Sequence, residues 1–109
     1  MRKVGVVLAT LVMGWAGSAL ALTPSEQRGF AFVKTNCSTC HAVGRYGDSP
    51  LAIAPPFRTL HESYPVEDLA EALAEGIVVG HPTMPQFQLE PDQVDDVIAY
   101  LKSLESPAQ

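Results

Sequence analysis

Two cysteines and a histidine lie within five residues, Cys37-Ser38-Thr39-Cys40-His41, and they restrict the fold of this 109-residue chain more than any other feature. They are the only cysteines in the protein. A helix is predicted just before them. It begins after Thr23, with Pro24 at its first position and Glu26 three residues after Thr23, which is a capping-box pattern. The motif therefore ends a helix, and its two thiols lie about one helical turn apart.

This spacing has two chemical interpretations. Cys-x-x-Cys-His is the attachment motif of c-type haem, in which two thiols add to the vinyl groups of one porphyrin edge and the adjacent imidazole ligates the iron. The alternative is a disulfide or a thioredoxin-like redox pair. A thioredoxin-like pair opens a helix within a βαβ unit, whereas this motif ends a helix and no strand precedes it. We therefore predict one covalent haem c bound through Cys37 and Cys40, with His41 as an axial ligand.

The N-terminal segment has the features of an export signal. Residues 4–22 contain no charged side chain, two basic residues precede them, and Ala19-Leu20-Ala21 forms a cleavage site of small residues. An uncleaved membrane anchor is the alternative, because the apolar stretch approaches the length of a spanning helix. We predict a signal peptide at residues 1–21, a single domain at residues 22–109, and a periplasmic location.

The charge balance disfavours several classes of partner. The chain has 12 acidic and 7 basic residues, a net charge of −5, and loss of Arg2 and Lys3 with the signal peptide lowers it to −7. Phosphate binding needs a surface rich in Lys and Arg, so nucleic acid and anionic membrane surfaces are not expected partners. Membrane contact is expected only through partner proteins or an uncleaved anchor. A domain of 88 residues has a thin core, which a cofactor would help to fill.

Helical patterns cover most of the remaining chain. A second helix is predicted from about Pro65 to Gly76 or Gly80, and a third from about Pro91 to Leu104. Their apolar faces are formed by Leu69, Leu73 and Ile77 in one helix, and by Val94, Val97, Ile98, Leu101 and Leu104 in the other. Segments rich in Gly and Pro separate the helices, and neither has the pattern of a strand pair. The predicted fold class is therefore all-α.

A second axial ligand would come from a Met, His or Lys of the exported domain. The candidates are Met84, His61, His81, Lys34 and Lys102. One lysine is too close to the motif and the other lies within the last predicted helix, while His61 is expected at the surface or on the side of the haem propionates. Met84 is the only methionine of the domain and stands between two prolines that stiffen its loop. It is the preferred ligand, and His81 is the alternative.

Together these features resemble those of class I cytochromes c of the short bacterial exported type, over residues 24–104. The similarity rests on Gly29, eight residues before the first cysteine, on the haem-attachment motif, on the Met84 loop, and on the run Val97–Lys102. It implies three or four helices wrapped around one haem. In that fold the terminal helices cross, and the residues expected at the crossing are Gly29, Val33, Val97 and Tyr100.

The resemblance also implies roles for single residues. The backbone carbonyl of Pro55 would accept the N–H of His41, and Phe57 would pack on the haem. Val33 stands where the family usually has an aromatic residue, and Ala54 where it usually has a glycine. The residues expected to hold the haem propionates are Arg45, Tyr46, Arg58 and Tyr64.

The resemblance implies a soluble periplasmic one-electron carrier, cycling between Fe(III) and Fe(II), rather than an enzyme. With His41 and Met84 both on the iron, no position is left for a small-molecule substrate. The expected partners are redox proteins with a basic docking patch, because the domain is acidic and lacks the lysine ring of mitochondrial cytochromes c. The alternatives are a haem c subunit of a larger oxidase or dehydrogenase complex, and a peroxidase or gas-binding protein in which Met84 dissociates.

Overall fold

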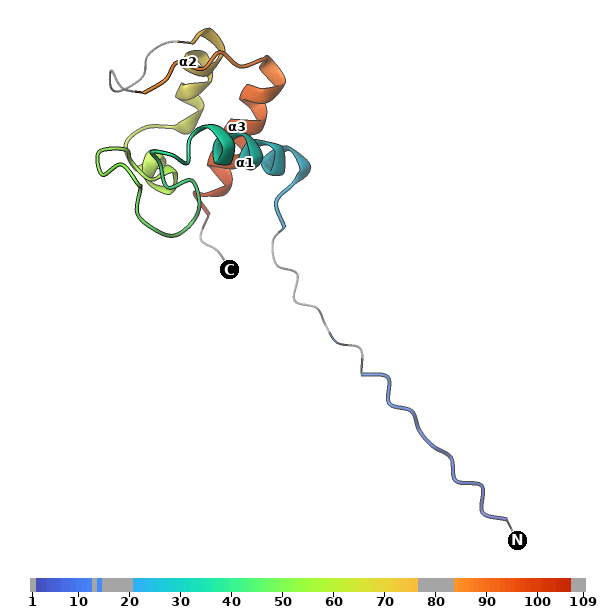
Figure 1. Ribbon diagram of the computed structural model, residues 1–109. Coiled ribbons are helices and arrows are strands. Elements are labelled where there is room, and N and C mark those ends of the chain that lie inside the picture. Colours follow the sequence, from blue (N-terminus) through green and yellow to red (C-terminus); the bar gives the residue numbers. More distant parts are fainter. Residues whose placement is uncertain (1, 13, 15–20, 77–83, 107–109) are drawn as a thin grey trace.

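The computed structural model describes residues 2–12, 14, 21–76 and 84–106. The described part contains helices and no strand: α1 (Pro24–Asn36), η1 (Phe57–Glu62), η2 (Val66–Asp68), α2 (Leu69–Glu75) and α3 (Pro91–Ser103), where η denotes a 3₁₀-helix. The all-α prediction is therefore confirmed. Residues 2–12 have no regular secondary structure and run away from the helices (Figure 1). Most of the predicted cleavage site lies outside the described residues. Among those described, no helix has the length and apolar character needed to cross a membrane.

The first helix begins where the sequence predicts. The backbone N–H of Glu26 donates to the Thr23 hydroxyl at 3.2 Å, and the Thr23 N–H donates to the Glu26 carboxylate at 3.3 Å. The two side chains thereby satisfy amide groups that the helix leaves unpaired. Pro24 takes the first helical position, where its missing N–H costs no hydrogen bond. The helix ends at Asn36, so the cysteine–histidine motif follows it directly, as predicted.

Helices α1 and α3 cross (Figure 1), and Gly29 of α1 lies against α3 at their contact. A Cβ atom on Gly29 would lie 2.0 Å from the backbone oxygen of Asp96 and 2.8 Å from the Cβ atom of Tyr100. Only glycine therefore allows this approach, and the predicted crossing is confirmed. The family usually has an aromatic residue where Val33 stands. Here the aromatic contact with α3 is made by Phe30 instead, whose ring centroid lies 5.3 Å from that of Tyr100. Val33 fills the core beside them and is 1 % exposed.

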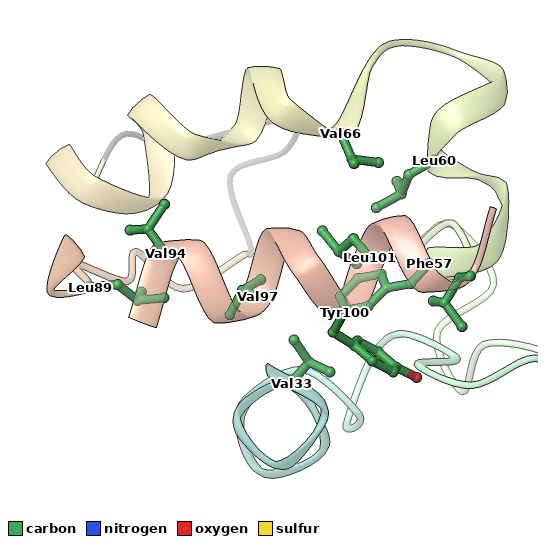
Figure 2. Close-up of a cluster of buried hydrophobic side chains, with 10 residues drawn as sticks. Val33, Phe57, Leu60, Val66, Leu89, Val94, Val97, Tyr100 and Leu101 are labelled. Atoms are coloured by element: carbon green, nitrogen blue, oxygen red, sulfur yellow. The ribbon is translucent and has the colours of Figure 1, made fainter. Parts of the chain in front are cut away.

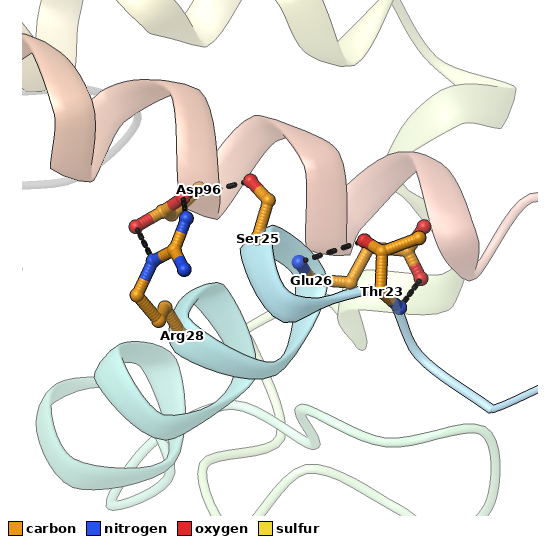
Figure 3. A network of polar contacts seen from close by, with 5 residues as sticks. All are labelled: Thr23, Ser25, Glu26, Arg28 and Asp96. Carbon is orange, nitrogen blue, oxygen red and sulfur yellow. Dashed lines mark hydrogen bonds and ion pairs between the residues drawn. The ribbon is translucent and has the colours of Figure 1, made fainter.

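A polar network joins the same two helices (Figure 3). The Arg28 guanidinium donates to both carboxylate oxygens of Asp96, at 2.9 and 3.1 Å, and the Ser25 hydroxyl donates to one of them at 2.7 Å. These hydrogen bonds, first from Arg28 and then from Ser25, hold the pKa of Asp96 below its usual range. The network thus links the two helices beside their crossing.

The second helical region departs from the prediction in its details. In place of one helix from Pro65, the chain forms η2 and then α2, which ends at Gly76 in the left-handed conformation with φ of +74°. Ile77 and Gly80, assigned to this helix from the sequence, lie outside the described residues. Helix η1 was not predicted, because a short 3₁₀-helix lacks the 3.6-residue periodicity by which α-helices are recognised.

The hydrophobic core lies along α3, with α1 on one side and η1, η2 and α2 on the other (Figure 2). The apolar face of α3 is buried as predicted, apart from Ile98, which is half-buried. The buried core residues are Val33, Phe57, Leu60, Val66, Leu89, Val94, Val97, Tyr100, Leu101 and Leu104. Five of these side chains also line a cavity, namely Val33, Phe57, Leu60, Val97 and Leu101.

Candidate functional site

An apolar cavity of about 290 Å³ lies between the helices. Aliphatic side chains from α1, η1, α2 and α3 line much of it, namely Val33, Leu60, Leu69, Leu73, Val97 and Leu101. Cys37 and His41 reach the same cavity from the segment that follows α1, and Met84 reaches it from the segment that precedes α3. One imidazole and two sulfur-containing side chains therefore line a largely apolar space.

The imidazole of His41 is held by the backbone. Its Nδ1 atom lies 2.8 Å from the carbonyl oxygen of Pro55, which confirms the predicted hydrogen bond. A carbonyl oxygen only accepts, so Nδ1 donates this hydrogen bond and Nε2 is the nitrogen that remains to bind a metal. The Phe57 ring lies against the imidazole, 4.8 Å between centroids. His41 itself is 8 % exposed.

Backbone hydrogen bonds fasten the motif to the loop that follows it. The Leu51 N–H donates to the Cys40 carbonyl at 3.1 Å, and the Phe57 N–H donates to the Ala42 carbonyl at 2.9 Å. The Tyr100 hydroxyl on α3 donates to the backbone carbonyl of Val43. The motif is therefore fixed by the loop and by α3 as well as by α1.

No disulfide joins the two cysteines, which lie one helical turn apart, with the Cys40 N–H donating to the Cys37 carbonyl at 3.2 Å. Cys37 lines the cavity, whereas Cys40 is half-buried beside it. Burial, and to a lesser extent the neighbouring Cys40, raises the pKa of the Cys37 thiol to about 11. A redox-active nucleophile needs a lowered pKa, so this environment disfavours the thioredoxin-like interpretation.

Met84 is partly buried and lines the cavity, as the preferred sixth ligand should. The alternative, His81, lies outside the described residues. The remaining candidates are exposed and do not line the cavity: His61, Lys34 and Lys102.

The segment after Met84 is anchored by contacts that the sequence did not predict. The Phe87 ring packs edge-on against Phe32 of α1, with 6.3 Å between centroids and 79° between planes. Both rings line the cavity. The Leu89 N–H donates to the Leu73 carbonyl of α2 at 2.9 Å. No local sequence pattern indicates this aromatic pair, because its two members are brought together only by the tertiary fold.

The four residues expected at the haem propionates are divided between two places. Tyr64 lines the apolar cavity, where burial raises the pKa of its phenol. Arg45, Tyr46 and Arg58 line a separate polar surface cavity. Arg45 donates to two carbonyl groups at the C-terminal end of α3, and Arg58 donates to a backbone carbonyl of the preceding loop. The structure therefore brings only Tyr64 to the candidate site.

This donor set fits a c-type haem. A porphyrin is a flat apolar ring, for which aliphatic and aromatic side chains provide suitable contacts. An imidazole nitrogen and a thioether sulfur are a known pair of iron ligands in cytochromes, and a thiol at the cavity wall suits covalent attachment. The hydrogen bond from His41 to Pro55 would orient one of these ligands before the haem binds.

Comparisons with known proteins agree with this interpretation. The cytochrome c family model matches residues 26–105. The cytochrome c-553-like protein of Synechocystis sp. is 28% identical over 90 residues, covering 83% of this chain and 79% of that protein. Cytochrome c-552 of Bradyrhizobium diazoefficiens is 30% identical over 100 residues, covering 92% of both chains. No solved structure matches the chain significantly. The chain therefore belongs to the cytochrome c family, as a class I member that carries electrons on a covalently bound haem c and is not an enzyme.

Proposed function

We propose that this protein is an exported, soluble one-electron carrier whose haem c is attached through Cys37 and Cys40 and ligated by His41 and Met84. The observation that carries the proposal is that the oriented imidazole of His41 and the Met84 side chain line one apolar cavity. When bound, the haem supplies an iron centre that is reversibly oxidised and reduced by one electron. Two protein ligands leave no position for a substrate, which favours electron transfer over oxygen or peroxide chemistry.

The residues around the cavity each have a part in this function. The Pro55 carbonyl holds the His41 ring in one orientation and raises its basicity as a ligand. The Met84 thioether and the apolar walls favour the reduced state, so we expect a raised reduction potential. Aliphatic side chains exclude water from the cavity, which limits rearrangement when the charge of the site changes.

The visible spectrum of the Met84→Ala holoprotein tests the ligand assignment. The oxidised wild-type protein should have low-spin bands and the weak far-red band typical of methionine ligation. The variant should lose the far-red band and either bind cyanide at an open position or take a new ligand with a lowered potential. His81→Ala is the matched control and should keep the band. A band that survives in Met84→Ala, or that vanishes in His81→Ala alone, would make His81 the ligand.

The same spectrum separates the remaining alternatives. A wild-type protein with high-spin bands that binds carbon monoxide directly would favour a peroxidase or gas-binding function. A haem c subunit of a larger complex would have the same bands as a free carrier. Size-exclusion chromatography of a periplasmic extract distinguishes these two, because the free carrier should elute at the size of the domain alone.

Export and cleavage are tested on the mature protein. A signal peptide at residues 1–21 places the new N-terminus at Leu22, directly before the capping residue of α1. Mass spectrometry of the periplasmic protein should therefore give a chain of residues 22–109 with one haem added. An intact chain that sediments with membranes would instead identify residues 4–22 as an anchor.

The expected partners are redox proteins with a basic docking patch, because the exported domain has a net charge of −7. Two segments are rich in acidic residues: residues 61–75 contain five acidic residues and no Lys or Arg, and residues 90–96 contain four acidic residues and no Lys or Arg. Attraction between opposite charges raises the encounter rate, and salt screens it over a Debye length of about 10 Å at 0.1 M. The electron-transfer rate with a cognate partner should therefore fall as salt rises, and a rate that does not change would exclude this steering.

A further inference from the structure

The loop that orients His41 contains neither a helix nor a strand. It covers residues 44–56, between the haem-attachment motif and η1. The carbonyl of Pro55, near the end of this loop, accepts the hydrogen bond from His41 Nδ1 at 2.8 Å. Irregular segments open more readily than helices, so the imidazole is oriented only as firmly as the loop itself is held. The contacts that fasten this loop to the rest of the domain therefore matter for the proposed iron ligand.

Arg45 joins the loop to the C-terminal end of α3. Its Nη1 atom donates to the carbonyl of Ser106 and its Nη2 atom to the carbonyl of Ser103, both at 2.6 Å. Ser103 is the last residue of α3, and the last carbonyls of a helix have no donor within it. A planar guanidinium is shaped to bridge two acceptors, and its charge is favoured at the negative end of the helix dipole. Arg45 thus caps α3 from the loop, which lies beside the red end of that helix in Figure 1.

This contact completes a ring of contacts around the proposed haem site. Helix α1 ends at the haem-attachment motif and meets α3 at Gly29. Helix α3 lines the cavity through Val97 and Leu101, and it ends at the Arg45 contact. The Tyr100 hydroxyl, which donates to the Val43 carbonyl, is a second link from α3 to the same part of the chain. The loop carbonyl that holds His41 is therefore placed relative to the helix that forms the cavity wall.

The other arginine of this region makes a different contact. Arg58 lies in η1, which directly follows the loop, and donates to the Gly47 carbonyl at 2.8 Å. Arg45 and Arg58 line the same polar surface cavity, together with Glu62 and Glu105. Neither arginine takes part in the two ion pairs found among the described residues. The two arginines thus share their charge and their cavity, but only Arg45 reaches α3.

We propose that Arg45 is a positioning residue for His41, because it fastens the loop that carries the Pro55 carbonyl to the end of α3. The proposal rests on the proposed function, since it concerns His41 as an iron ligand. A ligating histidine whose other nitrogen keeps its hydrogen-bond partner retains its ring orientation and its basicity. An imidazole held in one place in both oxidation states needs little rearrangement when the iron gains or loses an electron. Arg45 therefore favours rapid electron transfer without contacting the cavity.

Proton exchange in the reduced holoprotein, followed by nuclear magnetic resonance, tests this role. Arg45→Met removes the guanidinium and keeps most of the apolar stem of the side chain. It should raise the solvent-exchange rate of the His41 Nδ1 proton about tenfold, the size expected when hydrogen bonds from a charged group are lost. The Leu51 amide, which donates to the Cys40 carbonyl, should exchange faster by a similar factor. The Leu89 amide, which donates to α2 on the Met84 side, should keep its wild-type rate.

Arg58→Met is the matched control, because it removes the same charge from the same cavity. It should leave the exchange rate of the His41 proton unchanged. The electron self-exchange rate, measured in mixtures of oxidised and reduced protein, should fall in Arg45→Met and not in Arg58→Met. Tyr100→Phe removes the second link and keeps the ring, so it should raise the exchange rate of the His41 proton by a smaller factor. This variant tests the same ring of contacts if Arg45→Met gives no folded holoprotein.

The positioning role would be overturned by a His41 proton that exchanges at the wild-type rate in Arg45→Met or, where that variant does not fold, in Tyr100→Phe. An equal rise in Arg58→Met, or an equal rise at the Leu89 amide, would also overturn it, since neither is specific to the Arg45 contact. Equal self-exchange rates in the two arginine variants would overturn its part in electron transfer. Each of these results leaves the carrier function intact, whereas a wild-type protein without the signals of a haem-bound histidine would overturn the proposed function itself.

Discussion

The two sides of the haem cavity are built in different ways. On the His41 side, the backbone fixes the ligand: the imidazole donates to the Pro55 carbonyl, and the surrounding loop is paired to the motif through the N–H groups of Leu51 and Phe57. On the Met84 side, the described contacts are the packing of Phe87 on Phe32 and one hydrogen bond from Leu89 to α2. Among the residues that the structure describes, His41 is held by main-chain hydrogen bonds, whereas the segment after Met84 is held by an aromatic pair and one main-chain hydrogen bond.

This difference indicates how each ligand should respond to substitution. Main-chain hydrogen bonds persist when side chains change, so the orientation of His41 should withstand most substitutions nearby. Aromatic packing depends on the side chains themselves, so the Met84 side should loosen when one ring is removed. A carrier built in this way keeps one ligand in place while the other can be released, and this asymmetry can be tested.

The largest effect should come from removing both attachment sites. A Cys37→Ser, Cys40→Ser double variant should contain no covalent haem, because both thioether bonds need a thiol. Without haem the cavity of about 290 Å³ stays unfilled in a small core, so the variant should be largely unfolded. Haem staining after denaturing electrophoresis and far-ultraviolet circular dichroism measure the two outcomes. A double variant that is exported, folded and redox-active would contradict the haem assignment. It would also contradict the comparison between the His41 and Met84 sides of the cavity, which depends on that assignment.

Removing the Phe57 ring beside His41 should have the next largest effect. Phe57 is buried, with 8 % exposed, and packs on the imidazole, so Phe57→Ala should lower the free energy of unfolding by about 3–5 kcal/mol. Denaturant unfolding of the holoprotein measures this loss. The folded variant should nevertheless keep its far-red band, since Met84 lies on the other side. Loss of that band at low denaturant concentration would mean that the two sides are not independent.

Removing the ring on the other side should have a smaller but more local effect. Phe87 is only partly buried, so Phe87→Ala should cost less global stability than Phe57→Ala. Because it removes the aromatic pair that holds the Met84 segment, we expect the affinity for cyanide to rise about tenfold, equivalent to about 1.4 kcal/mol. Optical titration of the oxidised protein measures this affinity. A larger gain in Phe57→Ala than in Phe87→Ala would reverse the comparison.

The sequence predicts the His41 side of the cavity better than the Met84 side, because the contacts on the His41 side join residues that are close in the chain. The motif, its preceding helix and the Pro55 carbonyl are close in the chain or carried by the family resemblance, and the structure has the expected hydrogen bond. Gly29 was expected at the helix crossing from the family resemblance, and its close contact with α3 is present. Phe32 and Phe87 meet only in the folded chain, so no local pattern reveals them.

Charged side chains were harder to assign than apolar ones. Arg45 and Arg58 were among the residues expected at the haem propionates from the family resemblance. In the structure each is engaged with backbone carbonyls, one at the C-terminal end of α3 and one within its own loop. A long flexible side chain has many partners within reach, and its choice depends on the final positions of backbone groups. Helix η1, which begins at Phe57, depends in the same way on a backbone path that is set by tertiary contacts.

The smallest effect should arise at the helix crossing, which both sides of the cavity share. Hydrogen bonds from Arg28 and Ser25 lower the pKa of Asp96, so the folded protein holds this carboxylate in its charged form more strongly than the unfolded chain does. The resulting stabilisation is complete above the ordinary aspartate pKa of about 4 and is lost as pH falls through the lower folded value. Asp96→Asn should therefore be less stable than the wild type at pH 7, and the difference should shrink toward pH 2. Urea unfolding at several pH values measures this difference, with Asp95→Asn at the exposed neighbouring position as the control.

The same Asp96→Asn variant also tests what holds Met84. Because the crossing supports the whole domain and does not hold the Met84 segment in particular, the affinity for cyanide should not change. A rise in cyanide affinity like that expected for Phe87→Ala would show that Met84 is held through the crossing and not by the aromatic pair alone.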